Sequence, residues 1–94
     1  MVAFTLVLGA LAACSSAPVQ EMSDARQAIH AAVQSGAAEH APEQLSQAHN
    51  RLALAQQHLT LRRFDDARDE AVEARARATE ALYLTEAARR ARRD

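Results

Sequence analysis

Cys14 is the residue best suited to covalent chemistry, and it is the only cysteine among the 94 residues. A mostly apolar run from Val2 to Ala10 precedes it, and Ala12 and Ala13 stand directly before it. An apolar run that ends in small residues is typical of a secretory leader with its cleavage site. Because a thiolate is a strong nucleophile, the pattern predicts cleavage before Cys14 and attachment of a lipid to its sulfur. The alternatives are a free or buried cysteine, or a spanning helix, for which the run falls short of about 20 residues.

The tetrapeptide Leu11-Ala12-Ala13-Cys14 resembles the lipobox of bacterial lipoprotein signals. The resemblance implies that residues 1–13 are a signal peptide and that lipidated Cys14 becomes the N-terminus, with a membrane as partner. Residues 14–22 are then an extended tether, favoured by Pro18 and the serines. Ser15 resembles the signal that releases enterobacterial lipoproteins to the outer membrane, where we expect the chain to face the periplasm. The first four residues lack the Lys or Arg that normally opens a leader, so either the true start lies upstream or the segment has been trimmed, and we expect the former.

Four histidines raise the question of a metal site: His30, His40, His49 and His58. His49 and His58 are nine residues apart on one predicted helix, which places them on opposite faces at about 100° per residue. The sequence has neither the His-x-x-x-His nor the Cys-x-x-Cys spacing of metal sites. We therefore predict solvent-exposed histidines, no metal and no cofactor.

A run of carboxylates could be read as a pair of catalytic acids or as a cation site. Its members are Asp65, Asp66, Asp69, Glu70 and Glu73, and they alternate with Arg68, Arg75 and Arg77. A calcium loop instead places its oxygen ligands around a glycine turn. Glu73 with Arg77, and Glu86 with Arg90, have the four-residue spacing that supports a helix. The pattern therefore predicts a solvated helix surface.

A basic cluster closes the chain and consists of Arg89, Arg90, Arg92 and Arg93. In one interpretation these side chains contact anionic lipid head groups or cell-wall carboxylates. In the other they complement the negative end of a helix dipole and keep the protein soluble. The sequence leaves both open and favours the second.

Composition excludes several classes of function. The 11 basic residues, all arginine, are balanced by 12 acidic residues, and a net charge of -1 argues against a nucleic-acid binder. The chain has no glycine-rich phosphate loop, and its serines lack the strand-turn-helix setting of a nucleophile. We therefore expect neither enzymatic activity nor a small-molecule substrate.

The sequence predicts an all-α fold for residues 23–94, because alanine is abundant while glycine and proline occur only twice each. A first, shorter helix is expected from an N-cap at Ser23 or Asp24 to a stop at Gly36. Its apolar face should comprise Met22, Ala25, Ile29 and Val33.

A second helix is predicted from Pro42 to about Arg62, with Leu45, Ala48, Leu52, Ala55 and Leu59 on one face. Asp65 should cap a third helix after the corner Arg63-Phe64-Asp65-Asp66. That helix carries the stripe Ala67, Ala71, Ala74, Ala78, Ala81, Thr85 and Ala88. Helices two and three should form an antiparallel hairpin that the first helix completes into a small three-helix bundle.

Each long helix also carries a second apolar stripe, formed by Leu54 and Leu61 on one and by Val72, Ala76, Tyr83 and Ala87 on the other. Helix one can cover part of these stripes. The remainder, with Leu82 and Leu84, is a candidate surface for self-association or for a partner protein. The alternative is that Leu54 and Leu61 are merely tolerated at the surface.

Three segments together resemble a known family: Gly36 to Leu45, Ala48 to Leu59, and Arg63-Phe64-Asp65-Asp66-Ala67. The chain is similar to small bacterial envelope lipoproteins bearing the domain of unknown function 4398, with their A-P-x-x-L opening and aromatic-acidic corner. The corner also resembles half of a tetratricopeptide unit, although stable arrays need about three units. No segment resembles the OmpA-like peptidoglycan-binding domain of some members, and the family offers no catalytic residues to transfer.

These observations predict a non-enzymatic outer-membrane lipoprotein whose periplasmic helices dock an envelope protein or another copy of the chain. The alternative is a cell-wall or anionic-lipid binding module that acts through Arg89 to Arg93.

Overall fold

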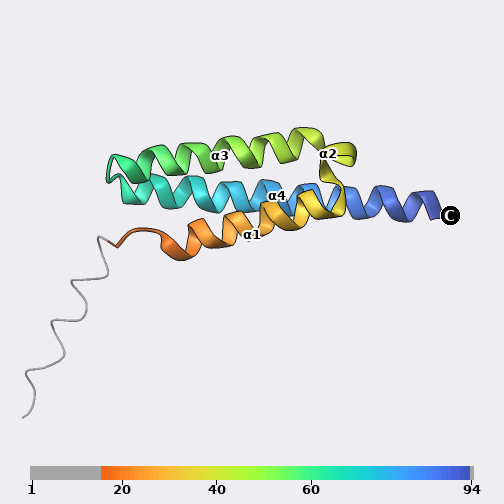
Figure 1. Cartoon of the computed structure of the whole chain (residues 1–94), viewed down its shortest axis with the longest axis horizontal. Coiled ribbons are helices and arrows are strands. Elements are labelled where there is room, and N and C mark those ends of the chain that lie inside the picture. The colour runs from red at the N-terminus through yellow and green to blue at the C-terminus, as the bar shows by residue number, and fades with distance from the viewer. Residues whose placement is uncertain (1–15, 94) are drawn as a thin grey trace, which may run out of the picture.

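Strong helix formers dominate the sequence after the predicted leader, and the chain is helical over nearly all of the part that its computed structural model describes, residues 16–93. The helices are α1 (Val19–Ser35), α2 (Ala37–His40), α3 (Pro42–Thr60) and α4 (Phe64–Arg93) (Figure 1). No strand occurs within these residues, so the predicted all-α class is confirmed.

Helix α1 begins four residues before the predicted N-cap at Ser23, so the end of the predicted tether is helical. Pro18 is the residue before the helix, and its carbonyl accepts a hydrogen bond from the Met22 N–H at 3.0 Å. The extra turn buries Met22, which is only 3% exposed. Ser23 and Asp24 do not cap the helix, because their side chains accept hydrogen bonds from Gln27 and Gln20 within it.

Helix α1 ends as predicted at Gly36, whose φ of 104° is in the left-handed region that glycine adopts without steric cost. Its N–H donates to the carbonyl oxygens of Ala32 and Val33. The single turn of α2 follows and was not predicted; it buries Ala37. Pro42 then opens α3 at the first helical position, as predicted.

The core is built on α4, where residues spaced by three and four form a stripe with no exposed surface. Its members are Ala67, Ala71, Ala74, Ala78, Ala81 and Thr85, all of them predicted. Such small side chains let neighbouring helices approach closely. Ala88, the last predicted member of the stripe, is half-buried.

Two helices pack against this stripe. Helix α3 contributes buried Leu45, Ala48 and Ala55, while its predicted core residues Leu52 and Leu59 are half-buried. Helix α1 contributes Met22, Ala25, Ile29 and Ala32. The prediction of Val33 for this face was wrong: Val33 is 46% exposed, because a face that contains Met22, Ala25 and Ile29 continues through Ala32.

The corner between α3 and α4 is a Schellman motif, in which the Arg62 N–H donates to Leu59 and the Arg63 N–H to His58, at 3.0 and 2.8 Å. Arg62 therefore takes a φ of 59°. The prediction of Asp65 as N-cap was wrong, because this tight end lets α4 restart at Phe64, with the Arg63 carbonyl accepting the Ala67 N–H. Asp65 lies in the first turn and pairs with Arg68 at 3.2 Å.

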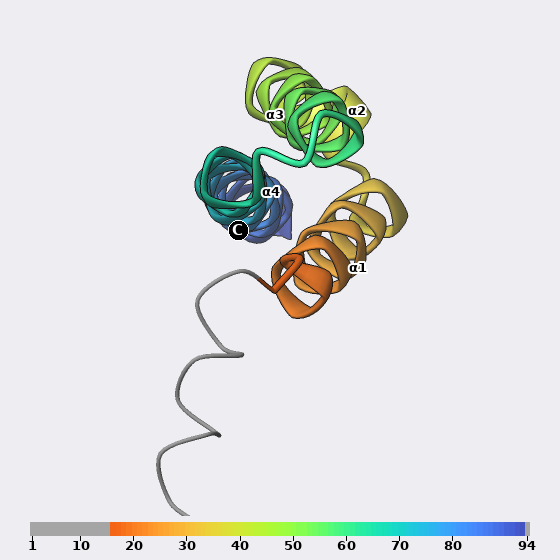
Figure 2. The same ribbon diagram turned by 90° about the vertical axis from the view of Figure 1, so that its left-hand side faces the viewer.

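Helices α3 and α4 form the predicted antiparallel hairpin, and α1 runs beside α4 in the same direction as α4 (Figure 1). Seen end-on, the three long helices occupy the corners of a triangle (Figure 2). The last turns of α4 extend beyond the other helices (Figure 1). One side of α4 is thus left without a neighbouring helix.

Replacing Thr85 with valine should stabilise the domain. The Thr85 side chain is fully buried and its hydroxyl has no hydrogen-bond partner. Because an unsatisfied buried polar group costs about 1–3 kcal/mol, Thr85→Val should raise the free energy of unfolding by about 1–2 kcal/mol. Urea denaturation followed by circular dichroism measures the change. The control is Thr60→Val, whose exposed hydroxyl donates to the Gln56 carbonyl; a similar gain there would contradict the explanation.

Replacing Arg62 with glycine should also stabilise the domain. A left-handed conformation costs a non-glycine residue about 1–2 kcal/mol. Glycine avoids this cost, but it also raises the conformational entropy of the unfolded chain, which cancels part of the gain in stability. We expect Arg62→Gly to gain about 0.5–1 kcal/mol in the same denaturation experiment. Arg62→Val should lower the stability, because a β-branched side chain tolerates positive φ poorly. If both variants shift the midpoint in the same direction, strain at this corner is not the cause.

Candidate functional site

Cys14, the predicted lipidation site, lies outside the described residues, which begin at Ser16. The first described residues lie beside the start of α4, because Arg68 donates a hydrogen bond to the Ser16 carbonyl at 3.0 Å. Arg68 also pairs with Glu21 of α1 at 3.7 Å. The chain therefore enters the domain at the end where α3 and α4 meet.

The four predicted partner-binding residues are all exposed, but they divide between two surfaces. Leu54 on α3 is 38% exposed and Leu61, directly after the helix, is 62% exposed, and both lie opposite the residues of α3 that face α4. Val72 and Tyr83 are 54% and 66% exposed and lie on α4 opposite its alanine stripe. Since the two helices pack through their buried sides, these pairs point away from each other.

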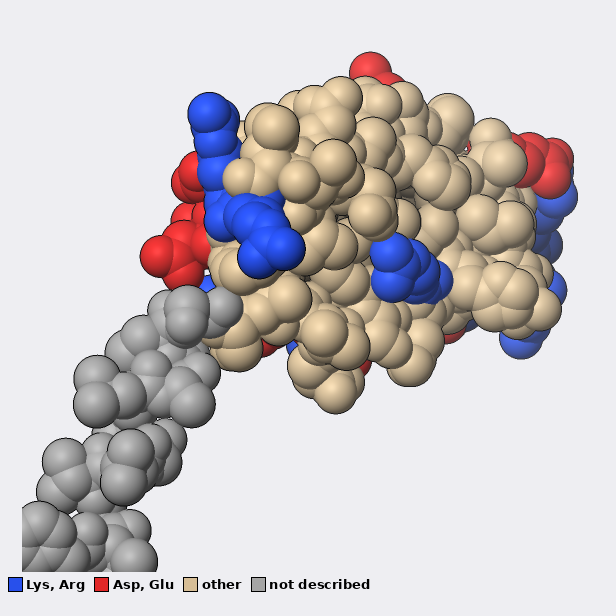
Figure 3. Space-filling view, turned by 60° about the vertical axis from the view of Figure 1, so that its left-hand side comes forward, with Lys and Arg blue, Asp and Glu red and all other residues tan. Residues whose placement is uncertain are grey.

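We call the first surface the α3 outer surface, defined by Leu54 and Leu61. The polar residues around it are mainly uncharged, among them Asn50 and Gln57. In the space-filling view the upper part of the molecule, where α3 lies, is mostly free of charge (Figure 3). Most of the visible charged side chains lie toward the two ends, with one basic group in the middle of the visible face (Figure 3). A partner could contact the apolar side chains of this surface, but the surface has no arrangement of charges that would select one partner.

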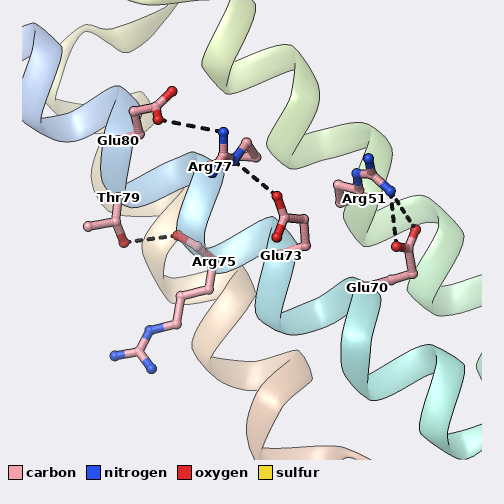
Figure 4. Close-up of polar contacts among 7 residues, drawn as sticks. All are labelled: Arg51, Glu70, Glu73, Arg75, Arg77, Thr79 and Glu80. Carbon is pink, nitrogen blue, oxygen red and sulfur yellow. Dashed lines mark hydrogen bonds and ion pairs between the residues drawn. The ribbon is translucent and has the colours of Figure 1, made fainter.

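We call the second surface the α4 outer surface, defined by Val72, Ala76, Thr79, Tyr83 and Ala87. All five residues are exposed and uncharged. The Thr79 hydroxyl donates to the Arg75 carbonyl at 2.9 Å, so this polar group is satisfied within its own helix (Figure 4). The charged residues Asp69 and Arg90 lie on the same side of α4, one beyond each end of the surface.

Arginines along the edge of α4 that faces α1 are a feature that the sequence analysis missed. Arg75 pairs with Asp24 of α1 at 4.0 Å, and Arg89 donates to the Ser35 carbonyl at 3.1 Å. With Arg68, these residues lie at multiples of seven, and Leu82 occupies the remaining position. Leu82 helps to line a shallow hollow between α1 and α4, together with Ala28. The seven-residue spacing was the available signal.

The basic cluster at the end of the chain is divided by the structure. Arg89 binds the C-terminal end of α1, where a cation meets the negative end of the helix dipole. Arg90, Arg92 and Arg93 are exposed in the projecting turns of α4. A surface hollow there is lined by Arg89, Arg90, Arg93 and the carboxylate residue Glu86. One of the four arginines is therefore already used within the fold.

The carboxylates of α4 act mainly in ion pairs. Glu70 accepts hydrogen bonds from Arg51 of α3 at 3.0 and 3.3 Å, which links the two helices of the hairpin (Figure 4). Arg77 pairs with Glu73 at 3.3 Å, as the four-residue spacing predicts, and with Glu80 at 3.5 Å. Within residues 16–93, Glu86 and Arg90 form no such pair. Exposed pairs of this kind each contribute little to stability. Of these pairs, Arg51 with Glu70 is the one that joins two helices.

The histidines are dispersed. His30 and His49 are exposed, His40 and His58 are half-buried, and their helices hold them apart. Across the described residues, no group of three or more His, Cys, Asp or Glu side chains is arranged to hold a metal ion. In the same part of the chain, no helix combines the length and the apolar character that crossing a bilayer requires.

Comparison with known proteins identifies a family but no characterised relative. No curated protein and no solved structure matches the chain significantly. A family model described as "Domain of unknown function (DUF4398)" matches residues 20–94, which include all the helices except the first residue of α1. The chain therefore belongs to the family defined by this domain of unknown function.

Proposed function

We propose that the chain is a non-enzymatic lipoprotein of the bacterial outer membrane that presents its helical domain in the periplasm for docking. Cys14 carries the lipid, and the exposed outer surfaces of α3 and α4 bind an envelope protein or a second copy. The observation that carries this proposal is the distribution of apolar side chains. The core is filled largely by alanine, while Leu61, Val72 and Tyr83 are each more than half exposed. Grouped apolar side chains at a surface mark interaction sites.

The position of the chain entry supports the anchoring part of the proposal. Ser16 lies beside Arg68 at one end of the domain, only two residues after Cys14. Lipid on Cys14 would thus hold that end of the hairpin near the bilayer. Leu61 of the α3 outer surface lies at this anchored end. The α4 outer surface runs from there along the helix and away from the bilayer, so it would remain open to a partner.

The non-enzymatic part rests on what the polar side chains do. The carboxylates Glu70, Glu73 and Glu80 pair with arginines at the surface. A catalytic pair of carboxylates would instead need a concave site that binds a substrate. The alternative of an arginine-mediated lipid or cell-wall module has less support, because Arg89 is engaged with Ser35.

Substitution of Cys14 should abolish lipid attachment. In Cys14→Ser, intact-mass spectrometry should find no acyl chains, and the protein should move from the membrane to the soluble fraction, because the thiol that takes up the lipid is gone. Ser16→Ala is the control and should keep both the lipid and the membrane location. An unmodified Cys14 in the wild-type protein, with residues 1–13 still attached, would refute the anchor.

Crosslinking in intact bacterial cells tests docking. A photoactivatable amino acid at Leu54 or Tyr83 should give an adduct of defined mass, because both side chains are exposed on the outer surfaces. The same amino acid at His30, exposed on α1, is the control. In the Cys14→Ser background the adducts should fall at least about tenfold if the partner is met at the membrane. Equal yields at all three positions would argue against a specific docking surface.

A further inference from the structure

The α4 outer surface has a charge pattern that the α3 outer surface lacks. Its five residues, Val72, Ala76, Thr79, Tyr83 and Ala87, carry no charge, and they end at Asp69 on one side and at Arg90 on the other. At about 100° per residue, all seven positions lie within one side of the helix. A single face of α4 thus has an acidic end, an uncharged middle and a basic end.

The spacing along this face is the same in both directions. From Asp69 toward the middle, the steps to Val72, Ala76 and Thr79 are three, four and three residues. From Arg90 in the opposite direction, the steps to Ala87, Tyr83 and Glu80 are also three, four and three residues. A copy of α4 that runs antiparallel, with its midpoint between Thr79 and Glu80, therefore presents matching positions along the whole face.

We propose that the occupant of the α4 outer surface is a second copy of the chain, paired antiparallel through α4 about a two-fold axis between Thr79 and Glu80. In this arrangement Asp69 of each copy faces Arg90 of the other. Between these charged ends, Val72 faces Ala87 and Ala76 faces Tyr83. Every contact occurs twice, as a two-fold interface requires.

The flanking residues add a second set of complementary charges. In an antiparallel pair, positions on the same side of each helix meet across the interface. Arg75 and Glu86 both flank the α4 outer surface on the side toward α1, and their distances from the midpoint differ by two residues, or about 3 Å along the helix, which their long side chains can span. Arg75 of one copy therefore meets Glu86 of the other. The Glu80 side chains approach each other near the axis, where Arg77, already 3.5 Å from Glu80, offsets their charge.

The alternation of large and small side chains suits close packing. Val72 opposite Ala87, and Tyr83 opposite Ala76, place a large side chain against a small one at each level. The Thr79 hydroxyl is bonded within its helix, so its methyl group can face the axis without leaving a polar group unsatisfied. From residue 69 to residue 90 the contact would extend for about 32 Å at 1.5 Å per residue.

The fold leaves room for a second copy. Helices α1 and α3 cover two sides of α4 and leave the third side open (Figure 2). The last turns of α4 extend beyond the other helices (Figure 1), and Arg90, near this end, is exposed. In the pair, the two Ser16 residues lie toward opposite ends, because each is bonded to Arg68 near the start of its own α4. Two anchors of this kind would place the pair lengthwise along a membrane.

Charge reversal with rescue tests the proposal, which deepens the proposed docking function but does not depend on lipid. The full chain is purified in nonionic detergent, and its dimer dissociation constant is measured by sedimentation equilibrium. Asp69→Arg and Arg90→Asp should each weaken the dimer about tenfold or more, because each creates two like-charge contacts. The double variant should recover to within about threefold of the wild type, since the charges are then exchanged and opposite again.

Matched controls separate this interface from other ones. Tyr83→Asp should abolish the dimer, whereas Val19→Asp, which removes an apolar side chain that is 73% exposed at the start of α1, should leave it intact. Thr79→Cys should crosslink to its own copy with a short bismaleimide reagent, with the wild type measuring any background from Cys14. Circular dichroism verifies that each variant keeps its helices.

Several outcomes would overturn the proposal. These are a monomer at all concentrations, a dimer that neither charge reversal weakens, a double variant without recovery, or a dimer lost on Leu61→Asp but kept on Tyr83→Asp. A Thr79→Cys adduct with a protein of different mass would assign the surface to another partner. None of these outcomes contradicts the proposed docking function if photocrosslinking at Leu54 and Tyr83 still gives adducts in cells. The dimer and the docking function are therefore tested by different experiments.

Discussion

The structure depends on the close approach of two helices to the alanine stripe of α4. An alanine side chain ends at its β-carbon, so α1 and α3 can both pack near the α4 backbone. Few large side chains are then needed: in the described part of the chain, the large apolar side chains that are buried are Met22, Ile29 and Leu45. The same packing places Leu61, Val72 and Tyr83 outside, where they supply the candidate docking surfaces.

Polar contacts at the edges of the helices fix how α1 and α3 lie along α4. Arg51 and Glu70 join α3 to α4, while Arg68, Arg75 and Arg89 reach α1 at positions seven or fourteen residues apart. Individually such exposed pairs are weak. Because the stripe consists almost entirely of alanines, it does not strongly favour one position of α1 or α3 along α4 over a position one turn away. The polar contacts at the helix edges therefore help to select the observed position.

A small domain with a thin core has a reason to associate. Domains of this size bury a modest fraction of their surface on folding, and binding to the folded state adds to their stability. On α4 the uncharged face between Asp69 and Arg90 could add such burial without altering the core. The proposed antiparallel pair and the membrane anchor are compatible, because the chain entry lies at the end of α4 remote from its projecting turns.

The sequence by itself determined the helical class, the end of α1 at Gly36 and the start of α3 at Pro42. It also determined the alanine stripe of α4 and the exposed apolar residues of the α3 and α4 outer surfaces, because spacing and local capping decide these features. It could not determine the start of α1, the use of Ala32 in place of Val33, or the restart of α4 at Phe64. Those depended on Met22 finding a buried position and on Arg62 taking a left-handed conformation. Only the tertiary structure decided that Arg89 binds Ser35 and that Leu54 and Val72 lie on separate surfaces. The physical reason is that contacts between helices depend on their relative rotation and position, which no single helix encodes.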